Sequence, residues 1–85
     1  MYRIAYLKPA RKALLKMPRN QAMLIRSKIE AMAQAPHAAN NNITPLTGRD
    51  ASRLRVGDWR VIFERHDDQG LIAVIDIGPR GSIYA

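Results

Sequence analysis

Two glycine-containing turns divide the C-terminal half of the chain into three short segments, each typical of a β-strand. Ser52–Val56 alternates polar and apolar residues, as a strand with one buried face does. Gly57–Asp58 then supplies a tight turn, and Trp59–Glu64 is rich in aromatic and β-branched residues. After a second turn at Asp67–Gly70, Leu71–Ile77 is nearly all apolar, so we expect a central strand covered on both faces. This half of the chain therefore predicts an antiparallel three-stranded meander.

The N-terminal half predicts one strand and two helices. Tyr2–Leu7 is short and contains two tyrosines, which suits an opening strand. From Pro9 to Met17 the apolar residues recur every three or four positions, which predicts a short helix that Pro18 ends. Asn20–Gln34 keeps the same period and predicts a second, longer helix. The Asn-rich stretch Ala35–Pro45 is expected to be a loop.

Together these segments predict an α+β fold. An N-terminal strand is followed by a two-helix hairpin and an antiparallel three-stranded meander, and all strands form one sheet with the helices packed on one face. A chain of 85 residues suffices for one domain with a thin core, so residues 1–85 are expected to be a single domain. A hydrophobic fraction of 47% is normal for a globular protein.

The composition narrows the classes of function. Without cysteine, the chain can form no disulfide scaffold, thiolate metal site or thiol nucleophile. His37 and His66 are not spaced as a metal-binding pair, so we expect no metal or other cofactor. No secretory signal opens the sequence and no apolar run approaches the ~20 residues of a membrane span, which predicts a cytoplasmic protein without membrane association. The net charge of +7 and a pI of about 10.6 favour a polyanionic partner.

Three arginines are predicted to share one face of the meander. If Leu54 and Val56 face the helices, Arg53 and Arg55 project from the opposite side of their strand, and Arg60 joins them from the next one. The planar guanidinium group binds phosphate with two parallel hydrogen bonds. Arginines on an exposed sheet face are also typical of a plain solvated surface that discourages aggregation. The spacing alone leaves both interpretations open.

Two stretches of the sequence resemble the RelE/ParE superfamily, the toxins of bacterial type II toxin–antitoxin systems. They are the run Leu-Arg-Val-Gly-Asp-Trp-Arg-Val over residues 54–61 and the run Gly-Pro-Arg-Gly-Ser-Ile-Tyr over residues 78–84. The opening strand and the helix pair also fit, so the resemblance covers essentially the whole chain. In this superfamily the RelE branch cleaves mRNA in the ribosomal A site, whereas the ParE branch inhibits DNA gyrase.

The resemblance implies a set of site residues. RelE-like members carry basic residues on the first two meander strands, an arginine after the last strand and a tyrosine near the C-terminus. The residues matching these positions here are Arg53, Arg55, Arg60, Arg80 and Tyr84. We therefore favour a ribosome-dependent mRNA endoribonuclease. The alternatives are a ParE-like gyrase inhibitor without nuclease activity and an inactive protein that only binds its antitoxin and operator DNA.

The implied reaction is a metal-free attack of an RNA 2′-hydroxyl on its neighbouring phosphate. We expect Arg60 to stabilise the charge of the transition state, and Arg53 and Arg55 to bind adjacent phosphates. Arg80 would neutralise or protonate the leaving 5′-oxygen, and Tyr84 would orient the 2′-hydroxyl or stack on a base.

The sequence offers no clear general base. Glu64 ends its predicted strand and is interpreted as an edge charge, and His66 as a solvated turn residue. The isolated protein is therefore expected to be a weak nuclease that depends on the ribosome to position the mRNA. Besides mRNA and the ribosome, the expected partner is a small antitoxin with an acidic C-terminal segment, which alone would contact operator DNA.

Overall fold

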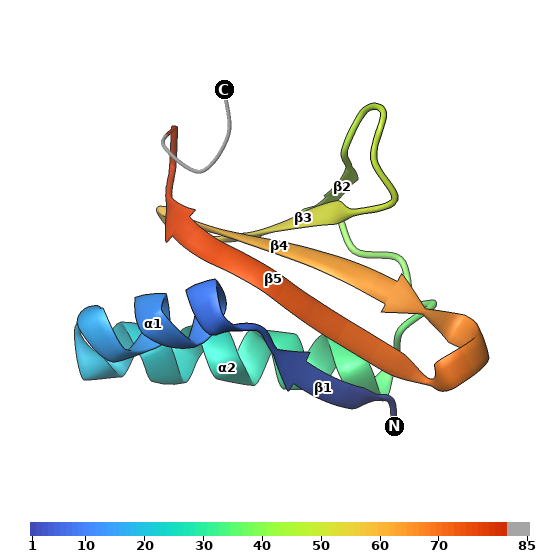
Figure 1. Ribbon diagram of the computed structural model, residues 1–85, viewed down its shortest axis with the longest axis horizontal. Helices are drawn as coiled ribbons and strands as arrows, with labels where there is room; N and C mark the ends of the chain where they lie inside the picture. Colours follow the sequence, from blue (N-terminus) through green and yellow to red (C-terminus); the bar gives the residue numbers. More distant parts are fainter. Residues whose placement is uncertain (82–85) are drawn as a thin grey trace.

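The computed structural model describes residues 1–81 of the chain, which form one five-stranded sheet and two helices. The elements in chain order are β1 (Arg3–Tyr6), α1 (Lys8–Lys16), α2 (Arg19–Gln34), β2 (Ile43–Pro45), β3 (Ser52–Val56), β4 (Trp59–His66), the 3-10 turn η1 (Asp67–Gln69) and β5 (Leu71–Pro79). The strand order is β1-β5-β4-β3-β2. β1 pairs with β5 in parallel, and every other pairing is antiparallel. Both helices lie on the same face of the sheet (Figure 1). The predicted α+β fold is confirmed.

The two helices begin and end close to the predicted positions. Pro9 occupies the first turn of α1, where a missing N–H costs no hydrogen bond. At the other end, the Met17 N–H donates to the Ala13 carbonyl at 3.2 Å. Pro18 then caps α2, because its carbonyl accepts the N–H of Gln21 at 3.0 Å and of Ala22 at 3.1 Å. One proline thus separates the helices and starts the second of them.

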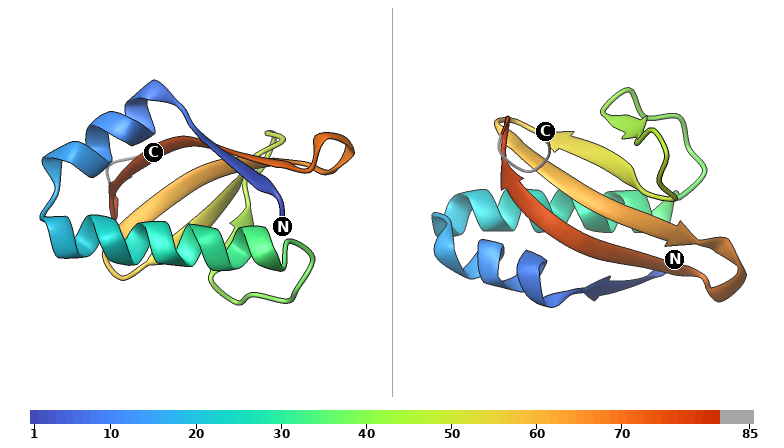
Figure 2. Two further views of the ribbon diagram at one scale, coloured as in Figure 1. Left: turned by 90° about the horizontal axis from the view of Figure 1, so that it is seen from below. Right: turned by 45° about the horizontal axis from the view of Figure 1, so that its top comes forward.

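The core lies between the helices and the sheet. Its helical half comes from the periodic apolar residues, with Ile25 and Ile29 fully buried on α2. The sheet contributes every second side chain of β3 and β4, and the two views of Figure 2 show α2 running along this side of the sheet. The buried sheet residues of this core are Leu54, Val56, Val61, Phe63, Ile72, Val74 and Ile77. Leu54 and Val56 therefore face the helices, as the alternation predicts.

The expectation that Leu71–Ile77 is covered on both faces is wrong. β5 does occupy the interior of the sheet, between β1 and β4, but only its helix-facing side chains are buried. Ile72 and Val74 are fully buried, while Leu71 and Ala73 on the other face are half-buried. The reason is architectural, because both helices pack on one face and the described chain has no third layer for the other.

Two further expectations are corrected. The predicted loop Ala35–Pro45 ends in the short strand β2, which pairs with Ser52–Leu54. Pro45 is compatible with this strand because β2 is the edge of the sheet and loses no ladder bond there. His66 is the last residue of β4 rather than a turn residue, and its Nε2 lies 3.0 Å from Glu64 Oε1. Beyond it, Gly70 closes η1 in the left-handed conformation that favours glycine.

Candidate phosphate-binding site

The arginines of β3 and β4 lie on the sheet face that the helices leave open. Arg55 is directly opposite Arg60, and Arg53 is directly opposite Ile62. Since the alternate residues of both strands are in the core, these three arginines point away from it. The register thus confirms the predicted common face. On the other side of β4, Arg60 is opposite Gly78, which has no side chain to cover it.

Arg80 joins this group from the end of β5. Its backbone N–H donates to the Asp58 carbonyl in the β3–β4 turn at 2.7 Å, so the chain leaving β5 stays beside that turn. As a result, four arginines from three parts of the sequence surround one cavity of about 310 Å³. The cavity is lined by Asn41, Asn42, Thr44, Arg53, Arg55, Arg60, Arg80 and Gly81. Tyr84, the remaining predicted site residue, lies outside the described residues.

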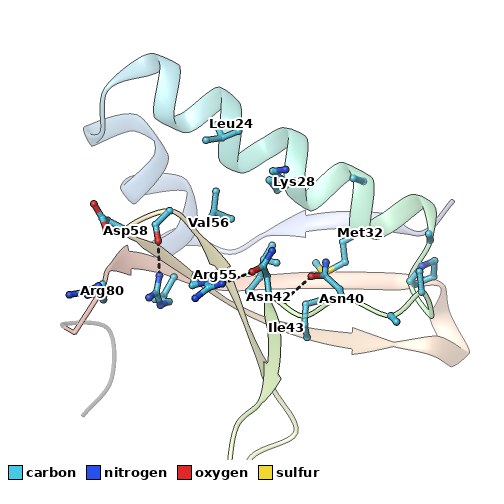
Figure 3. Close-up of a pocket in the computed structure, with 18 residues that line it drawn as sticks. Leu24, Lys28, Met32, Asn40, Asn42, Ile43, Arg55, Val56, Asp58 and Arg80 are labelled. Carbon is cyan, nitrogen blue, oxygen red and sulfur yellow. Dashed lines mark hydrogen bonds between the residues drawn. The ribbon is translucent and has the colours of Figure 1, made fainter.

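Asn42 fixes the orientation of Arg55 through two hydrogen bonds. Its side-chain Oδ1 accepts from Arg55 Nη2 at 3.0 Å, and its carbonyl accepts the backbone N–H of Arg55 at 2.8 Å. The N–H of Asn42 in turn donates to Asn40 Oδ1 at 2.9 Å. Figure 3 shows this chain of contacts running from the loop to the arginine. The loop before β2 is therefore part of the site, although its sequence carries no motif that indicates such a role.

Arg60 is held by backbone carbonyls. Its Nη1 donates to the Gly57 carbonyl at 3.0 Å and to the Trp59 carbonyl at 2.9 Å. Gly57 has a φ of +58°, so the turn that presents its carbonyl requires a residue that tolerates the left-handed region. A guanidinium group has five N–H donors, and those on Nη2 and Nε of Arg60 have no partner within residues 1–81. These donors remain available for an anion.

Three of the four arginines of the site carry a charge that no carboxylate of the described residues neutralises. Within residues 1–81, neither Arg55, Arg60 nor Arg80 forms an ion pair with a carboxylate. Arg65 differs, since its Nε lies 2.9 Å from Asp67 Oδ1 at the far end of β4. No carboxylate or histidine is among the described residues lining the arginine cavity. Its lining therefore provides charge and hydrogen-bond donors, but no general base.

A larger groove of about 690 Å³ continues from this cavity toward α2. Asn42, Arg55, Arg60 and Arg80 line both spaces, so the two are contiguous. The groove runs between α2, which contributes Leu24, Lys28 and Met32, and the edge of the sheet at Ile43 and Val56 (Figure 3). Its lining combines apolar side chains with the cationic ones of Lys28, Arg55, Arg60 and Arg80 and with the carboxylate of Asp58.

No cluster of three or more histidine, aspartate or glutamate side chains suited to a metal ion occurs within residues 1–81. Over the same range, neither helix has the length and apolar composition needed to cross a membrane.

Comparison with protein-family models gives one match, and it covers nearly the whole chain. The model described as "ParE toxin of type II toxin-antitoxin system, parDE" matches residues 4–84. A comparison with curated protein sequences returns no significant match.

Solved structures with a similar fold are toxins, many of them in complex with an antitoxin. The archaeal RelE–RelB complex from Pyrococcus horikoshii OT3 is similar at 26% identity and a TM-score of 0.77, over 95% of this chain and 97% of that one. The RelB–RelE complex from Methanococcus jannaschii has 25% identity and a TM-score of 0.73, covering 94% of each chain. The intact E. coli RelBE complex has 18% identity and a TM-score of 0.78, over 93% of this chain and 96% of that one.

Proposed function

We propose that this chain, which belongs to the ParE toxin family within the RelE/ParE superfamily of type II toxin–antitoxin systems, acts as a ribosome-dependent mRNA endoribonuclease. The observation that carries the proposal is the cavity surrounded by Arg53, Arg55, Arg60 and Arg80. Similarity to solved RelE structures, two of them at 25% identity or more, supports the RelE branch of the superfamily.

The reaction we propose uses the 2′-hydroxyl of the RNA as the nucleophile. This oxygen attacks the adjacent phosphorus, the bond from phosphorus to the 5′-oxygen breaks, and the products are a cyclic phosphate and a free 5′-hydroxyl. Negative charge accumulates on the phosphoryl oxygens in the transition state. Guanidinium groups held in place beforehand stabilise that charge without reorganising during the reaction.

The positions of the four arginines suggest a division of tasks. Arg60 is the best candidate for binding the scissile phosphate, because backbone carbonyls hold one end of its guanidinium and the other donors are available. Arg55, directly opposite, and Arg53 would bind neighbouring phosphates. Arg80, next to the β3–β4 turn, would neutralise or protonate the leaving 5′-oxygen. Tyr84 is proposed to orient the 2′-hydroxyl or to stack on a base.

The described residues that line the arginine cavity include no general base, which suggests that the reaction depends on the ribosome. Precise alignment of the 2′-oxygen, phosphorus and 5′-oxygen can contribute much of the rate on its own. We propose that mRNA held in the ribosomal A site is delivered in that alignment, and that free RNA is cut slowly. The site of action would then be the cytoplasm.

The expected partner of a toxin from this family is an antitoxin, and the similar structures include several toxin–antitoxin complexes. We propose that its C-terminal segment is acidic, because the toxin has a net charge of +7 and exposes a cationic groove. Contact with operator DNA would be made by the antitoxin.

Inhibition of DNA gyrase is the second candidate, and the ParE family match is the observation that favours it. Primer extension on cellular mRNA after brief expression of the toxin separates the two. The nuclease proposal predicts new 5′ ends inside codons within minutes. Intact mRNA together with loss of plasmid supercoiling would instead establish the gyrase inhibitor.

A further inference from the structure

Three consecutive asparagines lie beside the arginine cavity, and the structure gives each a different environment. Asn40 is structural, since its Oδ1 accepts the Asn42 N–H at 2.9 Å and its carbonyl accepts the Ile43 N–H at 3.2 Å. These two bonds close a β-turn over residues 40–43. The side-chain oxygen of Asn42 accepts a hydrogen bond from Arg55. Two of the three amides are therefore committed to the protein itself.

Asn41 is the exception. It occupies the first central position of the turn, is exposed, and lines the arginine cavity. Its side-chain amide makes no hydrogen bond or ion pair within residues 1–81. The turn beneath it is held by the two Asn40 bonds, so the backbone that carries this amide has a defined position.

The residues that line the cavity are consequently of two chemical kinds. One kind carries guanidinium groups, which bind phosphate whatever the base attached to it. The other comprises Asn41, Asn42 and Thr44, which are neutral hydrogen-bonding residues. A volume of about 310 Å³ is at the lower end of the range of small-molecule pockets, roughly 300–1,000 Å³, and suits one nucleotide rather than a longer segment.

We propose that Asn41 is a base-recognition residue, and that the base it selects is adenine at the nucleotide whose phosphate the arginines bind. This inference rests on the proposed endoribonuclease function. A carboxamide presents one acceptor and one donor side by side, and this pair matches the N6 amino group and the N7 of adenine. Guanine has acceptors at both corresponding positions, so one of the two hydrogen bonds is lost. Unstacked bases of single-stranded RNA expose these edges to protein side chains.

The test is single-turnover cleavage on ribosomes programmed with four mRNAs that differ only in one A-site nucleotide. The wild-type toxin is expected to cut the adenine-containing mRNA faster than the guanine-containing one by about tenfold, within the discrimination of 1–3 kcal/mol that a bidentate base contact provides. Asn41→Ala should reduce this ratio to about twofold or less, because the remaining contacts do not read the base.

Two further variants sharpen the result. Asn20→Ala, an exposed asparagine near the start of α2, is the matched control and should leave the ratio unchanged. Asn41→Gln keeps the carboxamide and should retain part of the preference, which separates recognition by the amide from the shape of the loop.

Each contrary outcome has its own meaning. A wild-type toxin that cleaves without base preference, an Asn41→Ala variant that keeps the full preference, or an equal loss in Asn41→Ala and Asn41→Gln would overturn the assignment of Asn41 alone. A wild-type toxin that cleaves none of the four mRNAs would overturn the proposed function, and this inference with it.

Discussion

Arg55 and Arg60 occupy directly opposite positions on two neighbouring antiparallel strands, so two like charges face each other across β3 and β4. Like charges directly opposite each other on neighbouring strands destabilise a sheet. Hydrogen bonds from Arg55 to Asn42 and from Arg60 to the carbonyls of the β3–β4 turn hold the two groups in place. A bound anion would convert this repulsion into attraction to a common ligand.

Polyvalent anions are therefore expected to stabilise the folded toxin. Phosphate or sulfate should raise the melting temperature more than chloride at equal ionic strength, because a ligand that binds only the native state adds about 2.7 kcal/mol at a hundred times its Kd. Calorimetry over a phosphate titration measures the effect. Arg60→Ala should shrink it, and Arg11→Ala on the exposed surface of α1 should not. Equal shifts with chloride and phosphate would argue against a specific anion site.

Removing Arg60 and Arg80 together should abolish toxicity. Loss of one fixed donor to a transition-state oxyanion typically costs about 10²–10³ in rate, so the Arg60→Ala/Arg80→Ala variant is expected to lose at least that factor in single-turnover mRNA cleavage. The matched control is Arg11→Ala/Arg19→Ala, which removes the same charge from exposed helical positions. If growth stayed arrested with the first variant and recovered with the second, the site assignment would be wrong.

Asn42→Ala should slow cleavage without changing which base is preferred. The substitution removes the side-chain bond to Arg55 but keeps the backbone bond that supports β3. A hydrogen bond of this kind contributes about 1–1.5 kcal/mol, so the cleavage rate is expected to fall roughly fivefold to tenfold. The base preference of the variant, measured on the same four mRNAs, distinguishes a positioning residue from a base-reading one. A wild-type rate would show that Arg55 needs no support from the loop.

The end of the sheet away from the arginines should respond to alkaline pH. The hydrogen bond that the Tyr2 hydroxyl donates to Asp67 at 2.9 Å raises the pKa of Tyr2 above its usual 10.0. Because the folded state favours the protonated phenol, this contribution is fully present below about pH 10 and is lost as the pH rises through the folded-state pKa. Tyr2→Phe should therefore be less stable than the wild type at about pH 8, with the gap closing at higher pH. Urea unfolding across this range measures the gap, and a constant difference would contradict the prediction.

Much of this fold could be predicted from local patterns. The helices follow from a 3.6-residue period and two prolines, and β3 follows from strict alternation. β2 could not be predicted, because three residues are too few to show a period and their pairing depends on a distant partner strand. The exposed face of β5 was missed for a related reason. Its apolar sequence does not reveal that the described chain has no helix to cover that side.

The site could be predicted in part. Alternation places Arg53, Arg55 and Arg60 on one face, but the convergence of Arg80 depends on a backbone bond to Asp58 that only the folded chain forms. The asparagine loop carries no motif, and its relevance comes from its place next to Arg55. The enzymatic roles of these residues, including that of Tyr84, remain predictions for the experiments above.

The pairing of β1 with β5 constrains the order in which the sheet can form. Among the described strands β5 comes last in the sequence, yet it lies inside the sheet and supplies partners to both β1 and β4. The register joins Arg3 to Leu71, a contact between residues near opposite ends of the chain. Such non-local pairing forms late because the intervening chain must first be ordered. The arginine cavity therefore forms only after β5 has been synthesised and has inserted between β1 and β4.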